Sequence, residues 1–271
     1  MSKTILTKEQ ENSIITDYNN GKSQNQLSKE YQVSTGTIKR ALIRNNIKIR
    51  SVQETNTSHY KIDENFFGIN NQTSESAYVL GLLASDGWVS KEDNCVCIEL
   101  QQSDKQILND VNIILKNERP IKDYIRASGY ANSKLYFFSK KIKEDLALYD
   151  IIPNKTYVDT NFTKNIKYEL LPDFLRGFFD GDGCVTSANG GIRWQLDGTS
   201  LETFLSILDY LKYNHITTVL ENTADNSCTI PRYRLYTYSK ERTQKIFDLC
   251  YYNPSVIKLE RKYNTFKTLL K

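Results

Sequence analysis

The sequence lacks most of the features that mark membrane, secreted and zinc-binding proteins. No apolar run approaches the length of a membrane span, and the opening MSKTILTKEQ lacks the apolar core of a signal peptide. The five cysteines include no C-x-x-C pair, and His59 and His215 are the only histidines, which argues against structural zinc. We therefore expect a soluble cytoplasmic protein with reduced thiols and no membrane partner.

The composition is that of a folded protein with unevenly distributed charge. Hydrophobic residues make up 39% of the 271 residues and charged residues 25%, a globular rather than a disordered balance. Residues 1–60 carry nine Lys/Arg against five Asp/Glu, whereas residues 61–271 carry 27 of each, so the net charge of +4 lies in the N-terminal part. This excess suggests a separate module that binds a polyanion, although a solvated surface would look the same.

Residues 7–47 show the pattern of three short helices. Thr7 and Gln10 form a capping-box signature, and Ser34 can cap the third helix. The stretch from Ser23 to Arg40 resembles the helix-turn-helix of resolvase and homeodomain-like proteins, whose third helix enters the DNA major groove. On this resemblance the candidate DNA contacts are Lys39, Arg40 and Arg44, with Lys48 and Arg50 as a trailing arm. A three-helix bundle with an incidental basic face is the competing interpretation.

From about residue 73 the chain repeats itself. The segment Ser76–Val89 is answered by Asp173–Val185, and the pairs Gly81 and Gly177, Asp86 and Asp182, and Gly87 and Gly183 are each 96 residues apart. Strand-like and helical stretches follow each motif in the same order, so each half predicts an αββαββα unit. We expect an α+β fold with two pseudo-symmetric repeats, preceded by a small all-α domain. The predicted domains are a helix-turn-helix (1–50), a linker (51–72), a first repeat (73–160) and a second repeat (161–271).

Each motif is an apolar helix with a central glycine, ending in an acid and a second glycine. A glycine inside a helix is unfavourable by about 1 kcal/mol, so Gly81 and Gly177 indicate close approach of two helix backbones. Gly87 and Gly183 would let the chain leave each helix into a strand. Two helices packed in this way would bring Asp86 and Asp182 together, and neighbouring carboxylates need a cation between them. Oxygen ligands favour Mg²⁺ or a similar hard ion such as Mn²⁺.

The repeats resemble the LAGLIDADG motif of homing endonucleases. The two copies are Val79–Gly87 and Leu175–Gly183. The resemblance implies a monomer whose paired sheets form a saddle over double-stranded DNA, and a metal-dependent cut in each strand that leaves short 3′ overhangs. It makes Asp86 and Asp182, at the eighth motif position, the catalytic metal ligands, with the backbone carbonyls of Ser85 and Gly181 helping to hold the metals. The sixth position is Asp180 in the second copy and Ala84 in the first, and in the family this position does not bind metal.

The family also uses polar and basic residues around the metals. Gln102, at the end of a predicted strand, could orient water, and its counterpart by motif spacing is Gly198. Lys155, and Lys258 or Lys262, could stabilise developing charge, although each could equally contact a phosphate or solvent. The isolation of His59 and His215 excludes nuclease classes that depend on a histidine base.

A basic and aromatic strand is predicted at Thr229–Tyr238, with Arg232, Arg234, Tyr236 and Tyr238 on one face. Arginine can donate two hydrogen bonds to guanine, so this face suits a DNA groove. Further candidate DNA contacts are Arg126, Arg193 and Gln195. An ordinary exposed sheet face is the alternative.

The sequence thus predicts a site-specific DNA double-strand endonuclease with an added DNA-binding module. A DNA-binding regulator that no longer cuts would be expected to lose one acid, and neither is lost. An RNA-splicing maturase on the same fold is the other alternative.

Overall fold

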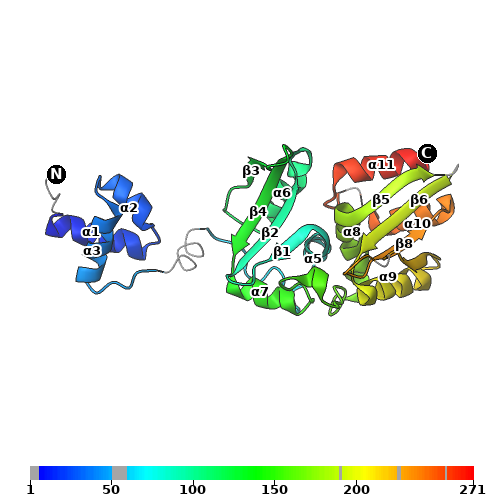
Figure 1. The fold of residues 1–271 in the computed structure, drawn as a ribbon, viewed down its shortest axis with the longest axis horizontal. Coiled ribbons are helices and arrows are strands. Elements are labelled where there is room, and N and C mark those ends of the chain that lie inside the picture. The colour runs from blue at the N-terminus through cyan, green and yellow to red at the C-terminus, as the bar shows by residue number, and fades with distance from the viewer. Residues whose placement is uncertain (1–5, 51–59, 189–190, 225–226, 254) are drawn as a thin grey trace. The chain divides into compact units, whose positions relative to one another are not determined.

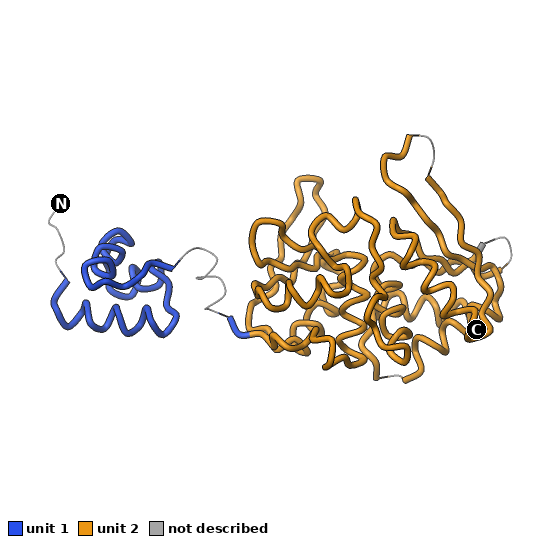
Figure 2. The backbone as a smooth tube through the Cα atoms, turned by 90° about the horizontal axis from the view of Figure 1, so that it is seen from below, with its two compact units in different colours: residues 1–61 blue, residues 62–271 orange. Residues whose placement is uncertain are grey.

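The structure, a computed structural model, describes residues 6–50, 60–188, 191–224, 227–253 and 255–271. The chain forms two compact units, residues 1–61 and 62–271, each with its own hydrophobic core (Figure 2). Among the described residues, no helix has both the length and the apolar character needed to span a membrane.

The N-terminal unit contains the three helices that the sequence predicts. They are α1 (Lys8–Asn19), α2 (Gln24–Glu30) and α3 (Thr35–Arg44). Thr7, Ser23 and Ser34 cap them, since each side-chain oxygen accepts a hydrogen bond from the backbone N–H three residues later. Ile14 and Leu27 are buried with residues of α3 in a small common core.

The larger unit consists of two αββαββα repeats and one additional helix (Figure 1). The first repeat comprises α5 (Ser74–Asp86), β1 (Gly87–Val89), β2 (Cys95–Gln101), α6 (Lys105–Ile114), β3 (Lys122–Ile125), β4 (Ala131–Phe138) and α7 (Lys140–Ala147). The second comprises α8 (Leu171–Asp182), β5 (Gly183–Ala188), β6 (Gly191–Gly198), α9 (Leu201–Tyr213), β7 (Val219–Asn222), β8 (Tyr233–Thr237) and α10 (Lys240–Cys250). The additional helix is α11 (Glu260–Leu270), and the short 3₁₀ helices are η1 (Gln102–Asp104), η2 (Lys155–Tyr157) and η3 (Tyr168–Leu170).

The two repeats build sheets of the same topology. Each sheet has four antiparallel strands, in the orders β1-β2-β4-β3 and β5-β6-β8-β7. The glycine that ends each motif begins the first strand, since Gly87 pairs with Ile98 and Gly183 with Leu196. The α+β class and the two-repeat architecture are therefore confirmed.

Helices α5 and α8 lie side by side between the two sheets (Figure 1). A Cβ atom at Gly81 would lie 2.6 Å from the backbone nitrogen of Phe178, and one at Gly177 would overlap the carbonyl oxygen of Tyr78. No side chain fits at either position, so the predicted backbone contact of the motif helices is confirmed.

The glycines that end the motifs are needed for a different reason than a left-handed turn. Gly87 has φ −86° and ψ 156°, and Gly183 has φ −81° and ψ 156°, which are ordinary extended values. A Cβ at Gly87 would lie 2.7 Å from the Cα of Leu83, and one at Gly183 would lie 2.6 Å from the carbonyl oxygen of Phe179. The chain doubles back against the last helical turn too closely for any side chain.

The predicted strand at Thr229–Tyr238 is wrong in its extent, because β8 covers only Tyr233–Thr237. Pro231 has no N–H with which to extend the ladder, and Ser239 already caps α10. The αββαββα pattern includes a strand at the place of β7 but no residue range was predicted for it, and α11 does not appear in the prediction.

Candidate active site

The motif helices end together and bring their acidic residues to one place. Asp86 is the last residue of α5 and Asp182 the last of α8. The helix ends are so close that a Cβ at Gly181 would lie 2.8 Å from a carboxylate oxygen of Asp86, and it would overlap the Ser85 hydroxyl. The predicted meeting of the two acids follows from glycine-mediated packing of the helices that carry them.

The carboxylates are held in an environment that disfavours two negative charges. Loss of hydration raises the pKa of Asp86 to about 6, and the charge of Asp182 adds to this effect. Loss of hydration also raises the pKa of Asp182 above its ordinary value. The nearby Lys155 and Lys262 lower both pKa values again, so the site already relies on positive charge.

Two lysines bind the ends of the motif helices, one in each repeat. The buried Lys155 donates from Nζ to the carbonyl oxygens of Gly87 at 2.8 Å and Ser85 at 3.4 Å. Lys262 donates from Nζ to the carbonyl oxygens of Phe179 at 2.9 Å and Gly181 at 2.5 Å. Burial lowers the pKa of each lysine, and the aspartates oppose this shift.

The sequence left open whether Lys258 or Lys262 lies at the site in the second repeat, and the structure distinguishes between them. The ammonium of Lys258 lies 3.2 Å from a carboxylate oxygen of Glu260 and donates to the carbonyl oxygen of Val256. Lys262 is the one that reaches the end of α8. The spacing of Lys258 and Lys262 alone could not decide this, because the intervening start of α11 was not predicted.

The donor set suits a hard divalent cation. It consists of the carboxylates of Asp86 and Asp182 and the carbonyl oxygens of Ser85 and Gly181, which already accept hydrogen bonds from ammonium groups. The described residues contain no cluster of three or more His, Cys, Asp or Glu side chains placed to bind a metal. A metal here would therefore complete its coordination with water and phosphate oxygens, as Mg²⁺ usually does.

Gln102 lies apart from the pattern expected of it. Its exposed side chain is in η1 and hydrogen-bonds to Asp123. The strand registers place Ile98 opposite Gly87 and Leu196 opposite Gly183, so the repeats are offset by 98 residues here. The second hairpin is thus two residues longer than the first, but α6 and α9 begin 96 residues apart, so the spacing of these helices keeps Gly198 as the counterpart of Gln102.

An inter-repeat ion pair lies near Asp86 and was missed from the sequence. Arg261 of α11 donates to both carboxylate oxygens of the buried Asp104, from Nη2 at 2.8 Å and from Nε at 3.2 Å. The charge of Asp104 is one of the influences that raise the pKa of Asp86. The signal for it, an acid and a base 157 positions apart, is visible only once α11 is known to cross toward the first repeat.

The predicted DNA contacts of the second repeat cluster on one sheet face. Gln195 pairs across strands with Tyr236, and Asp197 with Arg234, while the alternate residues Leu196 and Leu235 are buried in the core. Arg234 donates from Nε to Asp197 at 2.7 Å, and Gln195 donates to the same carboxylate at 2.6 Å. The Arg193 guanidinium lies 5.5 Å from the ring centre of Tyr238.

The corresponding face of the first repeat holds a similar acid–base cluster. Arg126 donates from Nε to Glu99 at 2.9 Å, and Asn132 donates to the same carboxylate at 3.0 Å. Glu99 also pairs across strands with Lys134, which in turn pairs with Lys122. The two lysines were not singled out in the sequence, because the pairing of β3 with β4 that brings them together is visible only in the structure.

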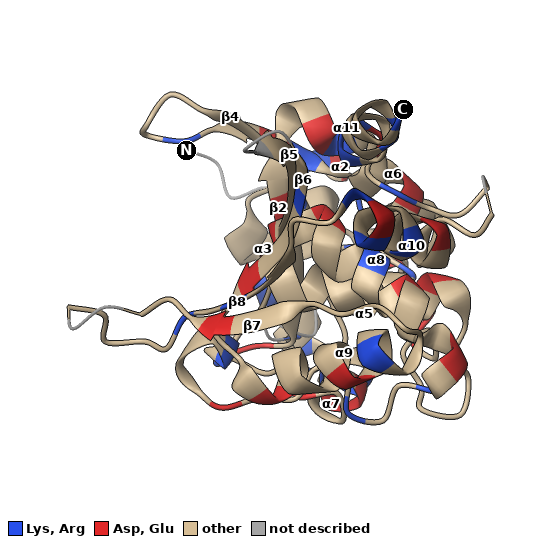
Figure 3. Cartoon of the chain, turned by 90° about the vertical axis from the view of Figure 1, so that its right-hand side faces the viewer, with Lys and Arg blue, Asp and Glu red and all other residues tan. Residues whose placement is uncertain are grey.

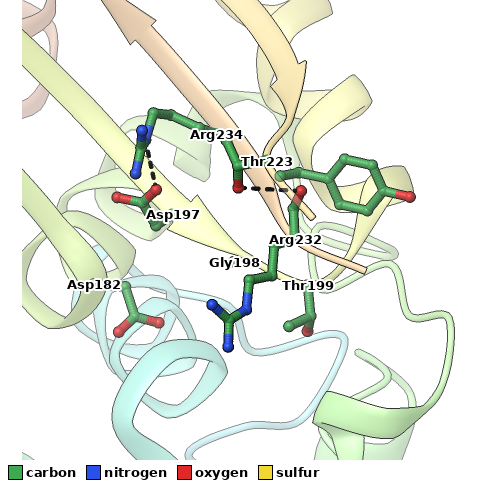
Figure 4. Close-up of a pocket in the computed structure, with 8 residues that line it drawn as sticks. Asp182, Asp197, Gly198, Thr199, Thr223, Arg232 and Arg234 are labelled. Atoms are coloured by element: carbon green, nitrogen blue, oxygen red, sulfur yellow. Dashed lines mark hydrogen bonds and ion pairs between the residues drawn. The ribbon is translucent and has the colours of Figure 1, made fainter. Parts of the chain in front are cut away.

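A cavity of about 600 Å³ opens beside Asp182 (Figure 4). Its lining residues are Asp182, Asp197, Gly198, Thr199, Thr223, Arg232, Tyr233 and Arg234. Figure 4 shows Arg234 turned to its ion pair with Asp197, whereas the Arg232 side chain extends into the cavity. Arg232, predicted within a strand but lying just before β8, thus lines the same cavity as the motif aspartate Asp182.

The predicted DNA contacts in the N-terminal unit fall into two groups. Lys39, Arg40 and Lys48 are exposed, the first two on α3. Arg44 is ion-paired with the buried Glu11 of α1, and the Arg50 guanidinium stacks 4.0 Å from the centre of the Tyr18 ring. The contacts of Arg44 and Arg50 therefore help to stabilise the bundle. A DNA contact by either side chain would have to form beside these contacts or replace them.

Charge on the larger unit is mixed rather than gathered by sign. Acidic and basic residues are interspersed over its helices and sheets (Figure 3), in line with the equal totals of the two kinds in residues 61–271. Any attraction of this unit for a polyanion must come from local placement of side chains, not from net charge.

Paired glycine-packed helices that join two matching sheets define a class of proteins built from a duplicated αββαββα unit. The model of the LAGLIDADG-like domain matches residues 73–152 and 169–250, so the chain belongs to the LAGLIDADG-like family and contains two copies of its domain.

The relatives found are distant. Over 151 residues the chain is 32% identical to the uncharacterized protein MJ0314 of Methanocaldococcus jannaschii, a match covering 55% of this chain and 54% of that protein. The chain thus spans about half the length of this relative. Similar solved structures include full-length DUF199/WhiA from Thermatoga maritima (TM-score 0.47, 15% identity, 77% of this chain and 65% of that one). Another is the meganuclease I-SmaMI bound to uncleavable DNA (TM-score 0.49, 12% identity, 70% and 87%).

Proposed function

We propose that the protein is a site-specific DNA endonuclease that cuts both strands of a duplex at one composite active site. The observation that carries this proposal is the meeting of Asp86 and Asp182 at the ends of α5 and α8. Each helix end there also binds a lysine, Lys155 or Lys262. Two carboxylates and two ammonium groups around one small site match the needs of phosphodiester hydrolysis, in which charge moves between oxygen atoms.

Asp86 and Asp182 would hold Mg²⁺ or Mn²⁺, with the carbonyl oxygens of Ser85 and Gly181 as further ligands. A bound divalent cation would supply Lewis acidity toward the phosphate and a water of lowered pKa. The raised pKa of each aspartate supports this assignment, because a bound cation would stabilise the charged carboxylates that burial disfavours.

The lysines would act beside the carboxylates. Each ammonium now donates to backbone carbonyls at the end of a motif helix, and each also lies near enough to Asp86 and Asp182 to affect their pKa values. From that place Lys155 and Lys262 can hold a phosphate oxygen and stabilise its developing negative charge. Gln102, turned toward Asp123, would have to rotate before it could orient a water molecule.

The open faces of the two sheets would contact the DNA. The proposed contacts are Arg126, Arg193, Gln195, Arg232 and Arg234, joined by Lys122 and Lys134 of the first repeat. Arg126 and Arg234 are each held by an acid on the same face, which fixes the planar donor pattern that can read guanine. Since one chain carries both motifs, a monomer would contain the complete site.

The N-terminal unit would add DNA contacts through α3, with Lys39 and Arg40 foremost and Lys48 beyond it. Tethering this unit to the nuclease raises the effective concentration of each for the same duplex. Recognition and cutting would thus be divided between the two units.

The proposal is tested with a plasmid library of randomised inserts, incubated with the full chain and Mg²⁺. We expect linear products with short 3′ overhangs at a recurrent insert sequence, and none when EDTA replaces Mg²⁺. Recurrent binding of one sequence with no cut in either strand would overturn the nuclease and favour a DNA-binding regulator. Selective retention of structured RNA instead of the library would favour a maturase.

A further inference from the structure

Asp180, the sixth residue of the second motif, is a buried carboxylate with three hydrogen-bond donors. Only 2% of the residue is exposed. Its Oδ2 accepts from the hydroxyl of Tyr78 at 2.8 Å and from the backbone nitrogen of Leu259 at 2.7 Å, and its Oδ1 accepts from the hydroxyl of Tyr251 at 3.4 Å. A charged group in the core needs such donors, but the metal site makes no use of it.

Two of the three donors to Asp180, Tyr251 and Leu259, belong to the connection between α10 and α11, and the third, Tyr78, belongs to α5. One turn earlier on α8, the fully buried Arg176 donates to the carbonyl oxygens of Cys250 at 2.8 Å and Ile257 at 2.9 Å. Arg176 is itself ion-paired with Asp173 at 2.8 Å. Helix α8 therefore binds both ends of this connection, Cys250 and Ile257 through Arg176 and Tyr251 and Leu259 through Asp180.

The end of the connection determines where Lys262 lies. Leu259 is the N-cap of α11, and Lys262 is in the first turn of that helix. The ammonium of Lys262 donates to the carbonyl oxygens of Phe179 and Gly181, the two residues that flank Asp180. The side chain of Asp180 thus accepts a hydrogen bond from the N-cap of α11, and the backbone carbonyls on either side of Asp180 accept hydrogen bonds from Lys262.

The first repeat delivers its lysine by another route and has no acid at this position. Lys155 lies in η2, directly after Asn154, whose φ of 59° turns the chain sharply. The residue equivalent to Asp180 is Ala84, and no helix like α11 follows α7 before α8. The sixth motif position is thus acidic in the second repeat, whose lysine lies on the separate helix α11. It is not acidic in the first repeat, whose lysine follows a tight turn.

We propose that Asp180 is a positioning residue whose carboxylate fixes the start of α11 and thereby places the Lys262 ammonium at the end of α8. This inference rests on the proposed nuclease function for its purpose, but the contact itself can be tested without DNA.

The first test measures how fast formaldehyde and a borohydride reductant methylate individual lysines of the intact, folded chain. Mass spectrometry of peptides from the labelled chain then locates the modified lysines. In Asp180→Ala we expect labelling of Lys262 to rise about tenfold, the effect of losing a hydrogen bond to a charged group. Lys155 serves as internal control and should label at its original rate. Asp180→Asn keeps a carbonyl oxygen for Leu259 and Tyr78, so its Lys262 should label as in the wild type.

Three labelling results would overturn the proposal. One is equal labelling of Lys262 in Asp180→Ala and the wild type. Another is Asp180→Asn behaving like Asp180→Ala, which would make the role electrostatic. A rise at both Lys155 and Lys262 would show general loosening and would also overturn it. Circular dichroism and a thermal melt establish that each variant is folded.

The second test measures the cutting of each strand separately, on the insert recovered from the plasmid library. Asp180→Ala should slow one strand about tenfold, the same strand that Lys262→Met slows, so that nicked circles accumulate. The matched control is Leu146→Ala, a buried residue of α7 in the first repeat, which should affect both strands alike. Equal slowing of both strands by Asp180→Ala would contradict the positioning role.

Failure of the nuclease proposal is separable from failure of this one. If the wild type cuts neither strand while Lys262 labelling still depends on Asp180, the nuclease is refuted and the positioning role stands.

Discussion

The ionised form of Asp86, which would bind a metal, is also the form that destabilises the folded protein. The folded protein raises its pKa from 3.8 to about 6, so the folded state binds a proton more tightly than the unfolded chain does. An ionised Asp86 therefore destabilises the fold. The penalty is fully present above pH 6 and disappears as the pH falls below the ordinary pKa. This is the expected state of a carboxylate kept for a cation rather than for folding.

From this it follows that Asp86→Asn should stabilise the metal-free protein near neutral pH. At pH 7.5 we expect the free energy of unfolding to rise by about 2 kcal/mol, the value of the pKa shift after allowance for partial exposure. At pH 4 the difference should largely vanish. Urea unfolding at the two pH values checks this, and a destabilised variant at pH 7.5 would contradict it.

Lys262 and Lys258 provide a matched pair at the residue scale. Lys262→Met removes the ammonium that binds the end of α8. We expect the rate of cutting of the strand that depends on Lys262 to fall about 100-fold, as for loss of a group that stabilises transition-state charge. Lys258→Met removes a lysine whose contacts include Glu260, Val256 and the ring of Tyr263 rather than the end of α8, so its cutting rate should stay near the wild-type value. Single-turnover cleavage measures both, and equal losses would contradict the assignment of Lys262.

At the scale of elements, the account depends on direct backbone contact between α5 and α8. Gly177→Ala would push a Cβ into the carbonyl of Tyr78, so we expect a loss of about 3 kcal/mol or more in the free energy of unfolding of the larger unit. Gly36→Ala is the helical control, since a Cβ there would meet nothing closer than the Ser34 hydroxyl at 3.7 Å. Thermal unfolding should show Gly36→Ala unchanged or stabilised, and a mild effect of Gly177→Ala would mean the helices can separate.

The same elements show what the sequence could predict. The glycine periodicity of the motifs predicts α5, α8 and their contact, because a helix interior tolerates glycine only for a packing reason. The extent of β8 could not be read from alternation alone, since Pro231 interrupts the ladder that alternation suggests. Helix α11 was missed because its start has no side-chain cap; its N-cap is Leu259, held by the distant Asp180. Local patterns predict local structure, and tertiary anchors are invisible to them.

For the site, the sequence identified the two acids but not their surroundings. Asp86 and Asp182 follow from the duplicated motif, whereas the choice of Lys262 over Lys258 depends on where α11 runs. The Arg261–Asp104 pair links segments from both repeats and has no local signature. The contact of Gln102 with Asp123 likewise joins separate segments, η1 and β3.

At the scale of the whole molecule, the claim is that two units share the work of binding DNA. Deleting residues 1–55 leaves the larger unit with its own complete core, so it should remain folded. We expect the dissociation constant for the recovered duplex to rise about tenfold or more and its salt dependence to become less steep, because phosphate contacts are lost. Binding isotherms at several salt concentrations measure both.

The deletion has a finer counterpart in the full chain. Combined Lys39→Ala and Arg40→Ala, on the exposed side of α3, should approach the effect of the deletion. Lys29→Ala, an exposed lysine of α2 outside the proposed recognition helix, should leave affinity near that of the wild type. Unchanged affinity and salt dependence after the deletion would mean that the N-terminal unit does not contact this DNA.

The central claim, one metal-dependent site shared by Asp86 and Asp182, is tested most directly by strand-resolved cleavage with single substitutions. Asp86→Asn and Asp182→Asn are each assayed on the recovered duplex in Mg²⁺, with binding measured in parallel in Ca²⁺. The account predicts that either substitution alone abolishes cutting of both strands while binding persists. Normal cutting of both strands by Asp182→Asn would contradict it.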